Sequence, residues 1–173
     1  MGSGTDIYLV RHAAAVDGEA GLSDDCRYLT AKGRKVFSKV ASELKGLGIS
    51  FDLIVTSPLV RAVQTAEILA GETKYRGEVV AATALGPGGR ALDHLLRTAG
   101  EMPGSSVAFV GHEPRMGQLA GELLGRGAMP FRKGQVMRIV FSGGVAPGVT
   151  GRFKWALMPS GERVDSLKDL DAA

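Results

Sequence analysis

The chain is predicted to fold as an α/β domain of three layers, with a mostly parallel central sheet between helices and an antiparallel edge. Strand-like and helix-like segments alternate over most of its length, and two consecutive strand-like segments follow. With 173 residues, 45% of them hydrophobic, the chain can bury one sizeable core. We therefore expect a single domain over residues 1–159 and a flexible polar tail over 160–173.

The expected strands are short runs rich in strand-forming residues. They are residues 6–11, 52–56, 78–81, 106–111, 135–141 and 152–157. Helical segments connect the first four, as the crossovers of parallel strands require. A turn rich in Gly and Pro joins the last two, so these are expected to be antiparallel.

The expected helices follow from capping residues and from apolar side chains at helical spacing. Thr30 is the predicted N-cap of the first helix, and Ser57 and Pro58 are the predicted N-cap and first residue of the second. A third helix is expected at about 91–99, and Pro114 is expected to open the fourth.

Charged and nucleophilic side chains follow three of the expected strands. They are Arg11 and His12 after the first, Ser57 to Arg61 after the second, and His112 after the fourth. Ligands of open α/β sheets bind beyond the carboxyl ends of the strands. These residues are therefore expected to form one site.

Arg61 gives the clearest physical indication of an anion site. It lies in the first turn of its helix, where unpaired N–H groups already present positive charge and where a second cation costs stability. A guanidinium group at such a helix end favours an anion. Arg11 interrupts an otherwise apolar strand and supplies a second planar fork suited to phosphate oxygens.

Two of the three histidines lie at the same edge. A neutral imidazole can attack phosphorus, and another can donate a hydrogen bond to the phosphoryl oxygens. The position of His12, next to Arg11, favours the first role, and the position of His112 favours the second. His94 lies within an expected helix and is interpreted as a structural residue without a role in the site.

Three motifs in order resemble the histidine phosphatase superfamily, whose fold is phosphoglycerate mutase-like. Residues 9–12 (LVRH) resemble its Arg-His signature, residues 57–66 (SPLVRAVQTA) its second arginine motif, and residues 110–112 (VGH) its second histidine. The similarity runs from Ile7 to Leu157. The short chain, residues 24–30 and the segments LGPGG and GHEP are most similar to SixA-type phosphohistidine phosphatases.

The resemblance implies covalent catalysis without a metal or other cofactor. His12 would attack phosphorus, water would hydrolyse the resulting phosphohistidine, and Arg11, Arg61 and His112 would stabilise the oxygens. It implies a phosphorylated substrate and a role in signal transduction. Arg27, oriented by Asp24, and Ser57 are further candidate binding residues; a solvated loop pair is an equal interpretation of Arg27 and Asp24.

The family's carboxylate general acid has no evident counterpart. Residues 82–89 contain no acid, and Glu78, Asp93 and Glu113 are candidates by sequence proximity alone. An alkoxide leaves poorly without a proton, whereas an imidazole can be protonated by solvent. This favours phosphohistidine on a partner protein. Alternatives are a phosphomonoesterase or mutase acting on small metabolites, and a non-catalytic phosphate-binding module.

Composition limits the remaining function classes. The net charge is only +3 and Lys and Arg are scattered, so no nucleic-acid partner is expected. A single cysteine, Cys26, forms no intramolecular disulfide, and no leader or membrane span is apparent. We expect no metal site, a cytoplasmic location, and a monomer or weak homo-oligomer.

Overall fold

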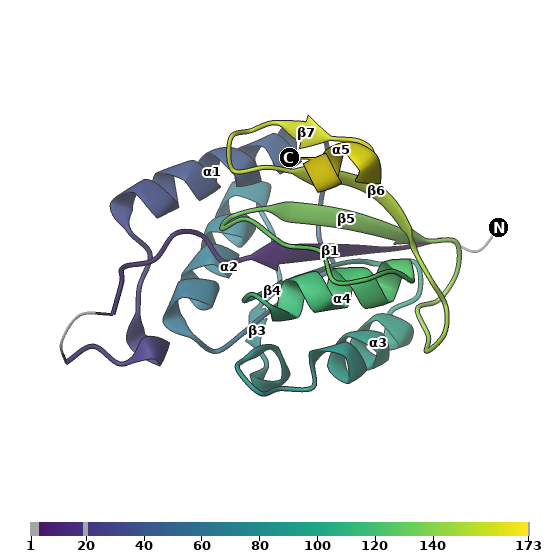
Figure 1. Ribbon diagram of the computed structural model, residues 1–173, viewed down its shortest axis with the longest axis horizontal. Coiled ribbons are helices and arrows are strands. Elements are labelled where there is room, and N and C mark those ends of the chain that lie inside the picture. The colour runs from purple at the N-terminus through teal and green to yellow at the C-terminus, as the bar shows by residue number, and fades with distance from the viewer. Residues whose placement is uncertain (1–3, 19–20, 173) are drawn as a thin grey trace.

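The computed structural model describes residues 4–18 and 21–172 (Figure 1). In these residues the strands are β1 (Thr5–Arg11), β2 (Leu53–Thr56), β3 (Val79–Ala81), β4 (Ser106–Gly111), β5 (Val136–Phe141), β6 (Arg152–Leu157) and β7 (Arg163–Val164). The helices are α1 (Ala31–Gly46), α2 (Val60–Thr73), α3 (Ala91–Glu101), α4 (Arg115–Leu124) and α5 (Leu167–Ala172). Two short 3-10 turns are η1 (Asp24–Cys26) and η2 (Thr83–Leu85).

The strands form one sheet in the order β3-β2-β4-β1-β5-β6-β7. β3, β2, β4 and β1 are mutually parallel, whereas β5, β6 and β7 continue the sheet as antiparallel strands. The predicted fold class, a mostly parallel sheet with an antiparallel edge, is confirmed.

Helices cover both faces of the sheet (Figure 1). On β1, Ile7 and Leu9 pack into the core beneath α3 and α4, whereas Tyr8 and Val10 pack into the core beneath α1 and α2. β1 is buried on both faces, which explains why it reads as a continuous apolar run. Because β1 is the central strand, the residues that follow it lie at the middle of the sheet edge.

The N-terminus of α1 is joined to the segment that follows β1. Thr30 accepts a hydrogen bond from the Gly33 N–H at 2.9 Å, as its predicted capping role requires, and its own N–H donates to the Ala14 carbonyl at 3.0 Å. A Cβ at Gly33 would collide with that same carbonyl. This close approach holds α1 against the chain just beyond His12.

Replacement of Thr30 by alanine is expected to lower the free energy of unfolding by about 1 kcal/mol, because it removes the side-chain cap of α1. Urea denaturation of the variant and the wild type measures this change. Thr30→Ser keeps the capping oxygen and should retain most of the stability. Equal losses in both variants would show that the methyl group, and not the cap, is what matters.

The start of α2 differs from the prediction. The helix begins at Val60, so Pro58 precedes it and Ser57 is not its N-cap. The Ser57 hydroxyl instead accepts a hydrogen bond from the Leu59 N–H at 3.3 Å and contacts a histidine on the neighbouring strand end. This local turn delays the helix by two residues and still leaves Arg61 in its first turn.

The C-terminal residues form defined elements where a flexible tail was expected. β7 pairs with β6, and Val164 is 5% exposed. Leu167 and Leu170 of α5 pack against the core on the α4 side. A two-residue strand and a six-residue helix are too short to give a periodic pattern, so the sequence interpretation missed them.

Candidate active site

The carboxyl ends of three neighbouring strands bring the candidate residues together. β2, β4 and β1 are adjacent and parallel, so the residues that follow them lie at one edge of the sheet. His12 follows β1, Ser57 follows β2 and His112 follows β4. The His12 and His112 rings lie 5.1 Å apart between centroids.

His12 is held as a neutral imidazole with one free nitrogen. The side chain is 6% exposed, and its Nδ1 lies 2.7 Å from the Ala13 carbonyl oxygen. A carbonyl can only accept, so Nδ1 carries the proton and Nε2 keeps its lone pair. Burial lowers the pKa of His12 to about 3, and the nearby His112, Arg61 and Arg11 act in the same direction. The imidazole is therefore neutral at pH 7, with the lone pair of Nε2 available.

His112 is fixed by Ser57. Its Nε2 lies 2.7 Å from the Ser57 hydroxyl, whereas its Nδ1 is buried and has no hydrogen-bond partner among the described residues. Burial lowers the pKa of His112 to about 4, with Arg61 as the next cause. The tautomer sets the direction of this bond: Nε2 donates to the Ser57 hydroxyl when it carries the ring proton, and accepts from it when Nδ1 carries the proton.

Arg61 is buried against the loop that precedes α1. It is 6% exposed, and its guanidinium donates to the Asp24 carbonyl at 2.5 Å and to the Asp24 carboxylate at 3.1 Å. Hydrogen bonds from Arg27 and from Arg61 lower the pKa of Asp24. Asp24 therefore remains ionised as the counter-ion of Arg61.

Arg27 contacts the cluster only through Asp24. Its guanidinium donates to the Val16 carbonyl at 2.7 Å and to the Asp24 carboxylate at 3.0 Å. No contact joins it to His12 or His112 among the described residues. In this structure Arg27 orients Asp24, and Asp24 in turn orients Arg61.

Arg11 is oriented from the opposite side. Its Nη1 donates to the Phe131 carbonyl at 2.6 Å, and its Nε is buried without a partner in the described chain. Burial lowers its pKa, and the nearby Glu113 carboxylate opposes that shift. Glu113 accepts hydrogen bonds from the backbone N–H groups of Gly117, at 3.1 Å, and Phe131.

A cavity of about 450 Å³ opens from the cluster. It is lined by Arg61, His112 and Glu113, by residues 85–88, and by the first residues of α4. Of the three acids considered from the sequence, only Glu113 lines this cavity. Glu78 lies outside it, and Asp93 is exposed and paired with Arg90 at 3.0 Å. His94 lies on α3, away from both site histidines.

Sequence reasoning missed two polar residues of α2 that hold the site together. The Thr65 hydroxyl accepts a hydrogen bond from the Ala13 N–H at 3.1 Å and donates to the Arg61 carbonyl at 2.7 Å. Gln64 accepts from the Leu29 N–H at 2.8 Å. Both residues belong to the SPLVRAVQTA segment that contains Arg61. Their closeness to Arg61 in the sequence could have indicated that they support the site.

The buried neutral histidines should make the fold sensitive to mild acid. Each has a pKa below its unfolded value of 6.5, so the unfolded state binds more protons at acid pH. The free energy of unfolding therefore falls as the pH drops below about 6.5. At one pH unit below that value, the loss is roughly 1 kcal/mol for each histidine. Burial raises the pKa of Glu113, which acts in the opposite direction. Urea denaturation at pH 7.5 and pH 5.5 measures the sum.

His12→Asn isolates one contribution to this acid sensitivity. The variant removes one titrating imidazole and should lose less stability between the two pH values than the wild type. An unchanged pH dependence would show that the imidazole of His12 titrates normally in the folded protein.

Comparison with known proteins identifies the family. The family model described as histidine phosphatase superfamily (branch 1) matches residues 7–85. An uncharacterized protein of Picosynechococcus sp. is 39% identical over 117 residues, which make up 66% of this chain and 70% of that protein. The protein histidine phosphatase SixA complexed with tungstate is 26% identical, with a TM-score of 0.78 over 90% of this chain and 97% of that chain. The chain belongs to the histidine phosphatase superfamily.

Membership places the chain among phosphatase enzymes. The serine/threonine-protein phosphatase Pgam5 of Drosophila ananassae is 42% identical over 74 residues, but these are only 25% of its length. The similarity to SixA covers most of both chains. Among the residues that the structure describes, no helix is long and apolar enough to cross a membrane, and no group of three or more His, Cys, Asp or Glu could hold a metal ion.

Proposed function

We propose that this protein is a metal-independent phosphatase that hydrolyses phosphohistidine on a partner protein through a phosphorylated His12. The arrangement of His12 carries the proposal. Its Nδ1–H is committed to the Ala13 carbonyl, and its Nε2 is free beside His112 and the two arginines. A fixed, neutral imidazole next to cationic donors is what nucleophilic attack on a phosphoryl group requires.

In the first step, Nε2 of His12 would form a bond to phosphorus while the P–N bond of the substrate breaks. The departing imidazole takes a proton from solvent. In the second step, water attacks the phosphorus on His12 and releases inorganic phosphate together with the neutral imidazole. Arg11, Arg61 and His112 would donate to the phosphoryl oxygens in both steps. Ser57 would act by fixing His112.

The acids nearest the cluster are engaged in other interactions, which favours a leaving group that needs no proton donor from the protein. Glu113 is committed to two backbone N–H groups, and Asp24 is held ionised by Arg27 and Arg61. An imidazole can leave after protonation by solvent, but an alkoxide needs a donor. This supports phosphohistidine as the substrate.

Access to the site supports a substrate carried on a protein. Pro114 and Gln118 are exposed at the cavity mouth, and the Asp24 side chain is 61% exposed. The similarity to SixA, which is described as a protein histidine phosphatase, points the same way. We also place the enzyme in the cytoplasm, in phosphohistidine signalling. The free, exposed Cys26 suits a reducing compartment.

The deciding experiment compares substrates and traps the intermediate. Purified protein is incubated with a histidine-phosphorylated phosphotransfer protein, with phosphoserine peptide and with sugar phosphates, and phosphate release is measured. Preference for the phosphohistidine protein, together with acid-labile phosphate mapped to His12 by mass spectrometry, is expected. Faster hydrolysis of the phosphoesters would favour a phosphomonoesterase. Phosphate binding without turnover of any substrate would favour a binding module.

Glu113→Gln tests whether Glu113 repels the substrate or donates a proton. The substitution removes a negative charge beside Arg11 and keeps one acceptor oxygen. We expect competitive inhibition by inorganic phosphate at a roughly threefold to tenfold lower concentration, with little change in kcat. Glu43→Gln makes the same charge change on the exposed face of α1 and should alter neither. A fall in kcat of about a hundredfold would instead identify Glu113 as the proton donor.

A further inference from the structure

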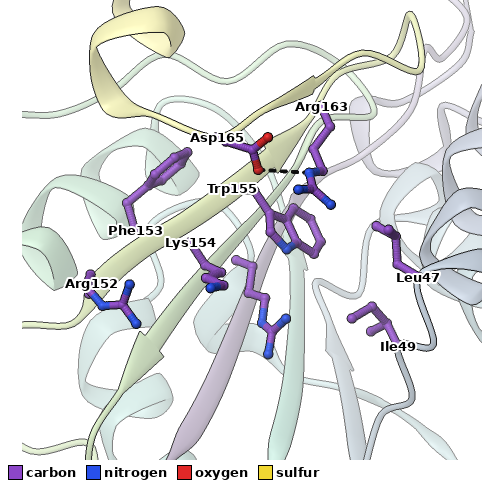
Figure 2. Close-up of a pocket in the computed structure, with 9 residues that line it drawn as sticks. Leu47, Ile49, Arg152, Phe153, Lys154, Trp155, Arg163 and Asp165 are labelled. Carbon is purple, nitrogen blue, oxygen red and sulfur yellow. Dashed lines mark hydrogen bonds and ion pairs between the residues drawn. The ribbon is translucent and has the colours of Figure 1, made fainter.

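A second pocket lies between the residues that follow α1 and the antiparallel strands of the sheet. Its volume is about 430 Å³ (Figure 2). Leu47 and Ile49, which follow α1, form one wall, and Figure 2 shows the Trp155 indole facing them across the hollow. β5, β6, β7 and Asp165, which follows β7, supply the other side chains.

The sheet side of this pocket is strongly basic. Its cations are Arg138, Arg152, Lys154 and Arg163, and the one acid that lines it is Asp165. Arg163 is paired with Asp165 at 2.8 Å, whereas Arg152 and Lys154 are exposed and form no ion pair within the described residues. Like charges around a hollow produce a positive potential there, and a bound anion would reduce the repulsion between the cations.

Arg138 is a preorganised donor that lines this pocket. Its side chain is only 23% exposed, its Nη2 is bound to the Asp6 carboxylate at 2.6 Å, and its guanidinium carbon lies 5.7 Å from the centre of the Tyr8 ring. One carboxylate and one aromatic ring fix the orientation of the guanidinium in advance. A ligand that binds it therefore orders no flexible side chain, which lowers the entropic cost of binding.

The pocket is separate from the catalytic cluster. Arg138 is tied to Asp6 near the start of β1, whereas Arg11 ends that strand, about 17 Å further along at the rise of a strand. Leu47 and Ile49 follow the end of α1, and the loop that carries Arg27 precedes its beginning. No residue that lines this pocket lines the catalytic cavity.

We propose that this pocket binds a small organic anion with a flat apolar part, in the size range of a nucleoside monophosphate. Arg138, Arg152 and Lys154 would bind the phosphate, and Leu47 and Ile49 would contact the ring. The volume is that of a small-ligand site. A macromolecular partner would need roughly 800 Å² of surface, which a single hollow of this size does not provide.

Trp155 gives a direct test because it is the only tryptophan of the chain. AMP, adenosine and inorganic phosphate are titrated separately against the full-length protein, with Trp155 fluorescence and equilibrium dialysis as readouts. We expect saturable binding of AMP that is tighter than that of either fragment. In the double variant Arg152→Glu, Lys154→Glu, AMP should bind at least about tenfold more weakly.

Two controls separate this pocket from other anion sites. Lys39→Glu makes the same kind of charge reversal on the exposed face of α1 and should leave AMP binding unchanged. Arg61→Ala should also leave the Trp155 signal unchanged, because the catalytic cluster is distant. The proposal is overturned if AMP produces no saturable Trp155 signal, if the double variant gives that signal at the same AMP concentrations as the wild type, or if phosphate alone changes Trp155 fluorescence as readily as AMP.

Discussion

His12→Ala is expected to reduce turnover by at least about a thousandfold, the largest effect of any single substitution in this chain. The substitution removes the only nitrogen placed to form the phosphorylated intermediate. The arginines and His112 would remain and could still bind phosphate, so substrate affinity should fall much less than rate. Initial rates of phosphate release from a phosphohistidine protein measure the effect, and mass spectrometry should find no phosphorylated enzyme.

A matched histidine variant controls for unspecific damage. His94 lies half-buried on α3 outside the cluster, so His94→Ala should leave the rate unchanged. The His12 variant should still unfold cooperatively, since its side chain contributes one hydrogen bond, to the adjacent Ala13 carbonyl. Substantial activity in His12→Ala, with the fold intact, would rule out the covalent mechanism.

The positions of the site residues could be predicted because they depend on topology. β4 and β6 have the bounds that the sequence indicates, and β1 and β2 differ from it by one residue at their starts. β1, β2 and β4 are mostly apolar runs that give way to polar or charged residues, and such a change is a strong local signal of the end of a strand. Once the strands are parallel and adjacent, His12 and His112 must meet at their ends.

The contacts that orient the arginines could not be predicted in the same way. The hydrogen bond from Arg61 to Asp24 spans 37 positions, and that from Arg11 to Phe131 spans 120. Asp24 lies in the short 3-10 turn η1 and Phe131 lies outside any helix or strand, and in both connecting segments the backbone path depends on tertiary packing. The sequence therefore indicates which side chains gather at the candidate site, whereas the loops determine how each guanidinium group is held.

Arg61→Ala is expected to lower kcat/KM by roughly 100-fold to 1,000-fold, the second largest effect. Arg61 is buried, its orientation is fixed by Asp24, and it lies in the first turn of α2, so the helix N-terminus and the guanidinium would act on the same phosphoryl oxygens. The loss should appear in both KM and kcat, because the interaction exists with substrate and strengthens as charge develops. Inorganic phosphate should also become a weaker inhibitor.

Arg61→Lys distinguishes charge from geometry at this position. Lysine keeps the positive charge but cannot bind Asp24 and a phosphoryl oxygen through one rigid planar fork. If orientation by Asp24 matters, Arg61→Lys should lose most of the activity lost in Arg61→Ala, and Asp24→Asn should show a smaller loss in the same direction. Near-complete activity in Arg61→Lys would mean that a positive charge alone is sufficient, and that the loop carrying Asp24 contributes nothing to catalysis through this arginine.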